Sequence, residues 1–188
     1  MSLWSYIRSL LTPLPVPSTD AEMREAEADI EADALPEAVR RARAWVGKGR
    51  YCLGAGGKKP EADDPWSTCA KPTTHGHTPA GRVFCDCSGF VCFVHRLARH
   101  DKTAGVWLNT DELEVRGKRQ GIAWINARPG DIVSYGAGKA IGHCGIVSEV
   151  DDAGPVRVIH CQARGTVAVV ETSADLFERK GAVLWRPS

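Results

Sequence analysis

The sequence has no long hydrophobic run and no excess of charge of one sign. No apolar stretch approaches a length of about 18 residues, which a helix needs to cross a bilayer, so we expect no integral membrane segment. The 24 basic and 23 acidic residues almost cancel to a net charge of +1. Nucleic-acid-binding proteins usually carry a basic excess gathered on one face, and the charge balance therefore argues against a nucleic-acid partner.

A clear secretory signal is also missing. No basic residue precedes the first apolar residues, Arg8 interrupts them, and no small-x-small cleavage site follows. The Pro-rich stretch over residues 13–17 indicates a linker. We expect a short helix before this linker, because four apolar residues share one helical face, namely Trp4, Ile7, Leu10 and Leu11.

The length and composition indicate one globular domain behind this leader. A chain of 188 residues has room for one domain with a real core but not for two full ones. Its apolar fraction of 43% and charged fraction of 25% match those of ordinary globular proteins, which excludes a disordered or fibrous class. We expect a helical leader and linker over residues 1–35 and a single domain over residues 36–188.

The order of the hydrophobic patterns predicts an α+β fold. Helical spacing follows Pro36 and recurs over residues 87–100. Short β-rich runs separated by glycine-containing turns come after these helices, namely GDIVSY, GHCGIVSEV, VRVIHCQA, TVAVVETS and AVLW. We therefore expect N-terminal helices, with the helix that begins at Cys87 packed against a C-terminal antiparallel β-sheet.

A long segment without apolar periodicity precedes this helix. Residues 58–84 contain Pro60, Pro65 and Pro79 together with several glycine, threonine and aspartate residues. Loops of this length are uncommon in compact domains and are usually functional or disordered. We predict an inserted loop over residues 58–84.

One of the seven cysteines has the position of a nucleophile. Seven is an odd number, so at least one cysteine is unpaired within the chain. Cys87 lies at a predicted helix N-terminus, where the helix dipole and unpaired N–H groups lower the pKa of a thiol. The same N–H groups stabilise the oxyanion of a tetrahedral intermediate. Cys92, Cys144 and Cys161 are interpreted as small buried core residues.

A nucleophilic thiol also needs a base within hydrogen-bond reach. Of the six histidines, His143 and His160 are the two that lie inside predicted strands of the sheet. Glycines around His143 leave space for close approach, and His160 shares a side with Val158 by the alternation of a strand. We expect one histidine to act as the base and the other to orient it, with Gln162 as the fallback orienter.

Five short motifs follow one another along the chain: RYCLGAGG at residues 50–57, DCSGFV at 86–91, RPGDIVSY at 128–135, GHCGIV at 142–147 and VIHCQA at 158–163. In this order they resemble the motifs of the NlpC-type family of bacterial cell-wall peptidases. The resemblance covers roughly residues 36–188 and implies a papain-like cysteine hydrolase domain. It also implies a catalytic triad with Cys87 as nucleophile, His143 as base and His160 as orienter.

The resemblance extends to the substrate. It implies cleavage of the amide bond between γ-D-glutamate and the diamino acid of peptidoglycan stem peptides. Tyr51 would lie near the thiol and help to bind the oxyanion, and Asp86 and Ser88 would hold the free amino end of the substrate. No cofactor and no metal are implied.

Two alternatives remain open. The same fold and triad also suit an amidase, an acyltransferase or a deamidase acting on another substrate. A zinc-binding interaction module is the alternative of a different class, because Cys69, His75, His77 and Cys85 are residue types that bind zinc and Cys52 lies upstream. Structural zinc sites usually pair ligands about two to four residues apart, a spacing that is missing around Cys85. In an oxidising space we expect a disulfide between Cys52 and Cys69 instead.

The expected compartment and partners follow from the same reasoning. Without a clear signal peptide, we expect the protein to be cytoplasmic as made, and to act in the periplasm or cell wall if a specialised route exports it. Its substrate partner would be the peptidoglycan stem peptide. If the protein is an exported effector, we also expect an immunity or inhibitor protein that binds it.

Overall fold

The computed structural model describes residues 35–57, 59–65, 67–68, 82–103, 105–136, 138, 141–165 and 167–188. The stretch Leu35–Ser188 forms one compact unit. Except for Leu35, the predicted leader over residues 1–35 lies outside the described residues, and its boundary with the domain stays a prediction. None of the described helices has the length and apolar character needed to span a membrane.

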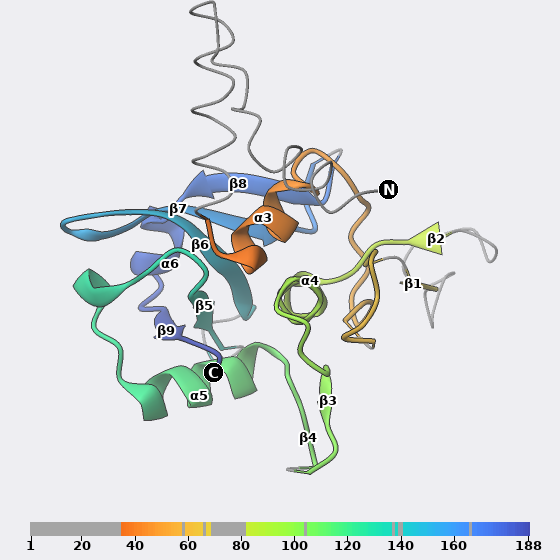
Figure 1. The fold of residues 1–188 in the computed structure, drawn as a ribbon, viewed down its shortest axis with the longest axis horizontal. Helices are drawn as coiled ribbons and strands as arrows, with labels where there is room; N and C mark the ends of the chain where they lie inside the picture. The colour runs from red at the N-terminus through yellow and green to blue at the C-terminus, as the bar shows by residue number, and fades with distance from the viewer. Residues whose placement is uncertain are drawn as a thin grey trace, which may run out of the picture. The chain divides into compact units, whose positions relative to one another are not determined.

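A five-stranded antiparallel sheet is the centre of the compact unit, with its strands in the order β8-β7-β6-β5-β9 (Figure 1). Each strand corresponds to one of the β-rich runs in the sequence, and every neighbouring pair is antiparallel. The predicted C-terminal antiparallel sheet is confirmed. The strand bounds are β5 Ile132–Tyr135, β6 His143–Asp151, β7 Gly154–Cys161, β8 Val169–Ser173 and β9 Val183–Trp185.

The sheet is buried on both faces, because successive residues of a strand point into two different clusters. Cys144 of β6 lies in one cluster together with helix α4, Cys87–Val94. Val147 of β6 and Val158 of β7 lie in the other cluster, where they surround the fully buried Phe177. The nucleophile helix therefore packs against the sheet as predicted, and the structure has the predicted α+β class.

Helix α4 is shorter than the sequence predicts. Helical spacing over residues 87–100 predicted a longer helix, but α4 ends at Val94. Arg96 then has a φ of 54°, which lies in the left-handed region and breaks the helix. Leu97 still packs against the core cluster, which explains why the apolar spacing extends past the helix end. The turn that follows brings the side chain of Arg99 into the interior.

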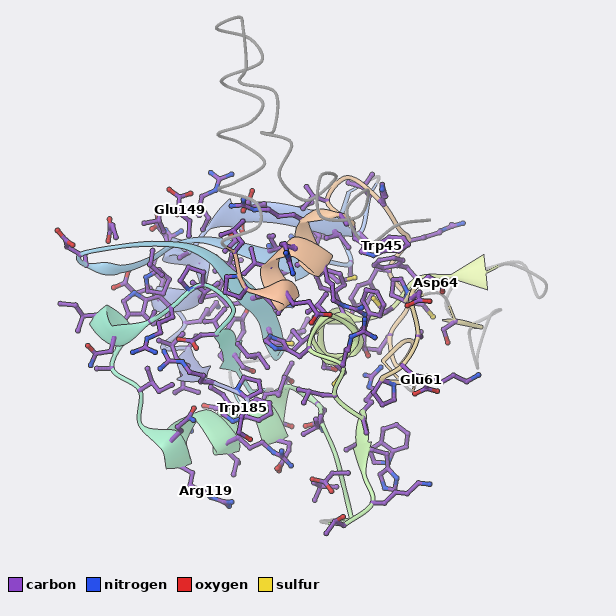
Figure 2. All side chains as sticks on the ribbon, in the orientation of Figure 1. Trp45, Glu61, Asp64, Arg119, Glu149 and Trp185 are labelled. Atoms are coloured by element: carbon purple, nitrogen blue, oxygen red, sulfur yellow. The ribbon has the colours of Figure 1, made fainter. Side chains whose placement is uncertain are left out.

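Helix α3, Glu37–Arg43, begins after Pro36 as predicted and buries Val39 and Ala42. Beyond its end, the ring of Trp45 lies with its centroid 5.2 Å from that of Phe84, and Figure 2 labels Trp45 beside this helix. The Trp45 ring thus covers the segment that leads into the nucleophile helix.

Helix α5, Thr110–Gln120, is not predicted by apolar spacing, because it buries only Leu113 and Gly117 among its residues. Its sequence signals lie at its ends. The Asn109 side chain caps the N-terminus, and Gly121 ends the helix with a φ of 66°. The remaining described elements are short, namely β3 His100–Asp101, β4 Val106–Trp107, the 3₁₀ helix η1 Trp124–Asn126 and α6 Asp175–Glu178.

The segment 58–84 is not irregular throughout. Its residues Ser67–Thr68, strand β1, pair in antiparallel fashion with Arg82–Val83, strand β2. Residues 58, 66 and 69–81 lie outside the described residues. Strands of two residues show no measurable alternation in a sequence, and the pairing was therefore not predicted. The function of this inserted segment stays a prediction.

The glycine-rich stretch before this segment packs tightly on α4. Gly57 has a φ of 65°, and a Cβ atom at this position would lie 2.6 Å from the carbonyl oxygen of Gly89 in the helix. Gly54 has a similar φ of 79°, but nothing lies within 4 Å of its Cβ position. Gly57 therefore combines a left-handed backbone with a close approach, whereas Gly54 has only the backbone requirement.

We expect Gly57→Ala to lower the free energy of unfolding by about 3 kcal/mol or more. The left-handed backbone alone costs an alanine roughly 1–2 kcal/mol, and the contact with the helix backbone adds a similar amount. Gly54→Ala is the matched control and should lose only the backbone cost of roughly 1–2 kcal/mol. Urea denaturation followed by tryptophan fluorescence measures both values, and equal losses would contradict the close packing of Gly57 on α4.

Candidate active site

Cys87 is the first residue of α4, and the residue before it fixes the start of the helix. The Asp86 Oδ1 accepts a hydrogen bond from the Gly89 N–H at 2.6 Å, so Asp86 is the N-cap. All residues of α4 are buried, and the Cys87 side chain is 5% exposed. Water therefore screens the helix dipole little at this point, which favours a negatively charged sulfur.

Two neighbouring side chains lower the pKa of Cys87 to about 5. The largest effect is a hydrogen bond with Cys144, and His143 adds a second hydrogen bond and its charge, while burial acts in the opposite direction. The pKa of the Cys144 thiol is raised well above its ordinary value, first by burial and then by Cys87. Cys144 thus keeps its proton and donates it toward the Cys87 thiolate.

The register of β6 and β7 brings His143 and His160 together. The His143 Nε2 lies 2.8 Å from the His160 Nδ1. Gly145 makes room for this contact, since a Cβ atom there would lie 2.9 Å from the His160 Cβ. The Phe177 ring stacks on His143 with centroids 5.6 Å apart and an interplanar angle of 19°. Because Nε2 is engaged by His160, Nδ1 is the nitrogen of His143 that serves Cys87.

His160 is a neutral imidazole. Its side chain is 2% exposed, and burial first and the charge of His143 second lower its pKa to about 3. Its second nitrogen, Nε2, lies 3.1 Å from the Thr172 Oγ1. The side chain that contacts His143 is that of His160. For Gln162, the fallback orienter, the structure gives a backbone hydrogen bond from its N–H to the Ala168 carbonyl at 2.7 Å.

The Asp86 carboxylate is filled by donors from the chain itself. Besides the Gly89 N–H, the Ser88 Oγ donates to Oδ1 at 3.1 Å, and the Gly54 N–H donates to Oδ2 at 2.7 Å. The Arg99 guanidinium donates to Oδ2 at 2.5 Å and to the Ser88 Oγ at 3.0 Å. This saturation does not favour the amine-binding role expected for Asp86 and Ser88, which stays an expectation from the resemblance.

Tyr51 lies close enough to Cys87 to respond to its charge. Burial first and Cys87 second raise the pKa of the Tyr51 phenol, so the phenol keeps its proton and remains a donor. The N–H groups in the first turn of α4 have no partner within the helix. Because Asp86 already accepts from the Gly89 N–H, the candidate donors for an oxyanion are Tyr51 and the N–H groups that precede Gly89 in this turn.

The residues of the zinc alternative are described only in part. Cys69, His75 and His77 lie outside the described residues, and so does the Cys69 half of the predicted disulfide. Over the described ranges, no group of three or more His, Cys, Asp or Glu side chains is arranged to hold a metal ion. Cys85 lies beside another cysteine, with its Sγ 4.0 Å from the Cys161 Sγ.

For three residues at the site, the sequence analysis did not predict the contacts that the structure shows. Cys144 is a buried core residue as interpreted, but it also contacts the nucleophile. Arg99 falls within the segment predicted as helix, where nothing indicated a buried cation. Thr172 was detectable, because Val170 is paired with His160 and Thr172 lies two residues farther along the same strand, on the same face.

Comparisons with known proteins found one family model and a distant structural likeness. Residues 77–162, which include Cys87, His143 and His160, match the family model of the CHAP domain. No curated protein matches the chain. The solved structure of the peptidoglycan hydrolase RipB from Mycobacterium tuberculosis resembles it with 18% identity and a TM-score of 0.42, over 90% of this chain and 71% of that chain.

The site thus brings a buried thiol at a helix N-terminus together with two histidines from neighbouring strands. The segment that matches the CHAP model is less than half of the chain. The activity of the site is therefore a matter for proposal. The bond that is cleaved and the role of each site residue are matters for proposal.

The low pKa of Cys87 predicts how its alkylation depends on pH. Iodoacetamide reacts with the thiolate, which is present above a pKa of about 5 and is lost as the pH falls through that value. We expect the Cys87 alkylation rate, followed by peptide mass spectrometry, to change by less than about twofold between pH 8 and pH 6. An ordinary thiol with a pKa of about 8.5 would slow by well over tenfold in that range.

Cys92, on the same helix, is the internal control for this experiment. Burial raises the pKa of Cys92 to about 12, so it should stay unmodified in the folded protein over the whole range. A steady tenfold loss of Cys87 alkylation for each pH unit below 8 would show that the thiol is not activated.

The buried pair of Asp86 and Arg99 predicts a loss of stability when its cation is removed. Arg99→Met leaves the Asp86 carboxylate buried without its cation, and we expect the free energy of unfolding to fall by about 3–5 kcal/mol. Arg96→Met is the control, because Arg96 pairs with Glu37 on the surface and should lose less than about 1 kcal/mol. Adding Asp86→Asn to Arg99→Met should recover part of the loss, and denaturant titration measures all three variants. Equal losses for Arg99→Met and Arg96→Met would contradict the importance of the buried pair.

Proposed function

We propose that this protein is a cysteine peptidoglycan hydrolase in which Cys87, His143 and His160 form the catalytic triad. One observation carries the proposal, namely that the acidic Cys87 thiol is hydrogen-bonded to His143, whose other nitrogen lies 2.8 Å from His160. The CHAP match over the segment that contains the three residues supports it, because CHAP domains are amidases or peptidases that act on peptidoglycan.

In the acylation half of the reaction, the Cys87 thiolate attacks the carbonyl carbon of the scissile amide. The new C–S bond forms as the carbonyl electron pair moves onto oxygen, and the first N–H groups of α4, with the Tyr51 hydroxyl, hold the resulting oxyanion. His143 then passes its Nδ1 proton to the departing nitrogen as the C–N bond breaks. The leaving amine is released, and a thioester remains on Cys87.

Deacylation repeats these steps with water as the nucleophile. His143 Nδ1 takes a proton from water while the water oxygen bonds to the thioester carbon. When the oxyanion collapses, the C–S bond breaks, the electron pair returns to sulfur, and the carboxyl product leaves. His160 remains neutral throughout, in keeping with its low pKa of about 3, and holds the ring of His143 in place.

For the bond that is cut, we propose the amide between γ-D-glutamate and the diamino acid of the stem peptide. One observation favours a second candidate, an amidase that separates the stem from the sugar at its first alanine. The Asp86 carboxylate already accepts from Gly54, Ser88, Gly89 and Arg99. With the carboxylate saturated, the site lacks an evident anion for a free substrate amine, and a stem still attached to its sugar has no such amine.

Digestion of purified peptidoglycan with wild type and Cys87→Ala tests the proposal. We expect Cys87→Ala to release soluble fragments roughly a thousandfold more slowly or worse, because the nucleophile is gone. Cys92→Ala, which removes a buried thiol from the same helix, should retain activity. Equal digestion by wild type and Cys87→Ala would exclude Cys87 as the nucleophile.

The masses of the fragments identify the bond. An endopeptidase cuts within the stem, an amidase frees the whole stem, and a deamidase changes the mass of a stem by only about one dalton. An acyltransferase would instead yield joined stems. Whole free stems would replace the endopeptidase assignment by the amidase.

A further inference from the structure

Two neutral imidazoles in contact can share one hydrogen bond in two directions. Either the His143 Nε2–H donates to the His160 Nδ1, or the His160 Nδ1–H donates to the His143 Nε2, across the same 2.8 Å. The two arrangements place the proton of His143 on different nitrogens. The choice between them decides whether His143 can serve Cys87.

Catalysis by the proposed triad requires the first direction. To accept the proton of Cys87, His143 Nδ1 must carry a lone pair, so the ring proton must sit on Nε2. Once His143 is an imidazolium, both of its nitrogens carry protons, and the His160 Nδ1 must then be an acceptor. If His160 instead carried its proton on Nδ1, that N–H group and the Nε2–H group of His143 would point at each other.

The side chain of Thr172 meets the other end of His160. Its Oγ1 lies 3.1 Å from the His160 Nε2. The contact follows from register, because His160 is paired with Val170 and Thr172 is the diagonal neighbour on the same face of the sheet. The Thr172 hydroxyl has a separate acceptor for its own proton in the Ser173 carbonyl at 3.4 Å. Oγ1 is thereby left with lone pairs that face His160.

We propose that Thr172 is a positioning residue that holds the proton of His160 on Nε2 and so fixes the direction of the hydrogen bond from His143. This inference rests on the proposed triad. A buried N–H without an acceptor is costly, and Thr172 supplies the acceptor only to the tautomer that catalysis needs. The hydrogen-bond chain then runs in one direction, from His143 through His160 to Thr172.

Among the described residues around His143 and His160, Thr172 is the acceptor that meets the His160 Nε2. The titratable groups that the structure brings to Cys87 and the two rings are Asp86 from the start of α4, Cys144 from β6, Tyr135 from β5 and Tyr51 from the glycine-rich stretch. Phe177 packs on both imidazoles and offers no hydrogen bond. Among the described residues, the hydrogen bond recorded for His160 Nε2 is the one with Thr172.

Thr172→Val and Thr172→Ser separate the hydroxyl from the shape of the side chain. Valine keeps the volume and loses the acceptor, whereas serine keeps the acceptor. In the alkylation experiment, extended to pH 5, we expect Thr172→Val to move the midpoint of Cys87 alkylation upward by about one pH unit and so to lower the rate at pH 5 roughly fivefold, because the imidazolium of His143 loses its acceptor. Thr172→Ser should stay within about twofold of wild type. A purely structural role would change unfolding temperature without moving this midpoint.

Histidine ¹⁵N chemical shifts in the wild type test the tautomer without any variant. We expect His160 to be protonated on Nε2 and bare on Nδ1, and a proton on Nδ1 would overturn the proposal. An unchanged alkylation profile in folded Thr172→Val would also overturn it. Both measurements use no substrate, so they are separate from the digestion assay: an activated thiol without peptidoglycan cleavage would refute the proposed function and leave the role of Thr172 standing.

Discussion

The buried carboxylate of Asp86 is the constraint on which the geometry of the site depends. It accepts hydrogen bonds from the first turn of α4, from the glycine-rich stretch and from Arg99, beyond the end of the helix. Burying this charge would be prohibitive without such partners. Because each donor comes from a different segment, satisfying one carboxylate holds three parts of the chain around Cys87. The position of the nucleophile is thus fixed by an electrostatic requirement as much as by apolar packing.

Burial opposes the charged form at both Cys87 and His160, but the outcome differs between the two residues. At Cys87 the desolvation that opposes a thiolate is outweighed by the hydrogen bonds from Cys144 and His143. At His160 nothing outweighs it, so this imidazole stays uncharged. The result is one ionisable pair, Cys87 and His143, followed by a neutral support.

The sequence allowed the sheet, the helix that begins at Cys87 and the strand positions of His143 and His160 to be predicted, because alternation marks the strands and capping residues mark the helix start. The end of α4 was predicted wrongly because Leu97 packs half-buried against the core outside the helix and so continues the apolar spacing. The role of Arg99 depends on a turn at Arg96 and on a carboxylate earlier in the chain. Such contacts join residues through the fold, and no local pattern records them.

A neutral orienter changes what the rest of the site must supply. A carboxylate in the place of His160 would stabilise the imidazolium of His143 by its charge, whereas an uncharged imidazole contributes only a hydrogen bond. The charge separation between Cys87 and His143 must then be supported mainly from the sulfur side. There the helix N-terminus and the Cys144 thiol act together, and Cys144 makes the largest contribution to the low pKa of Cys87. In the proposed triad, the Cys144 thiol, next to His143 on β6, therefore supports the thiolate that the neutral His160 does not stabilise by charge.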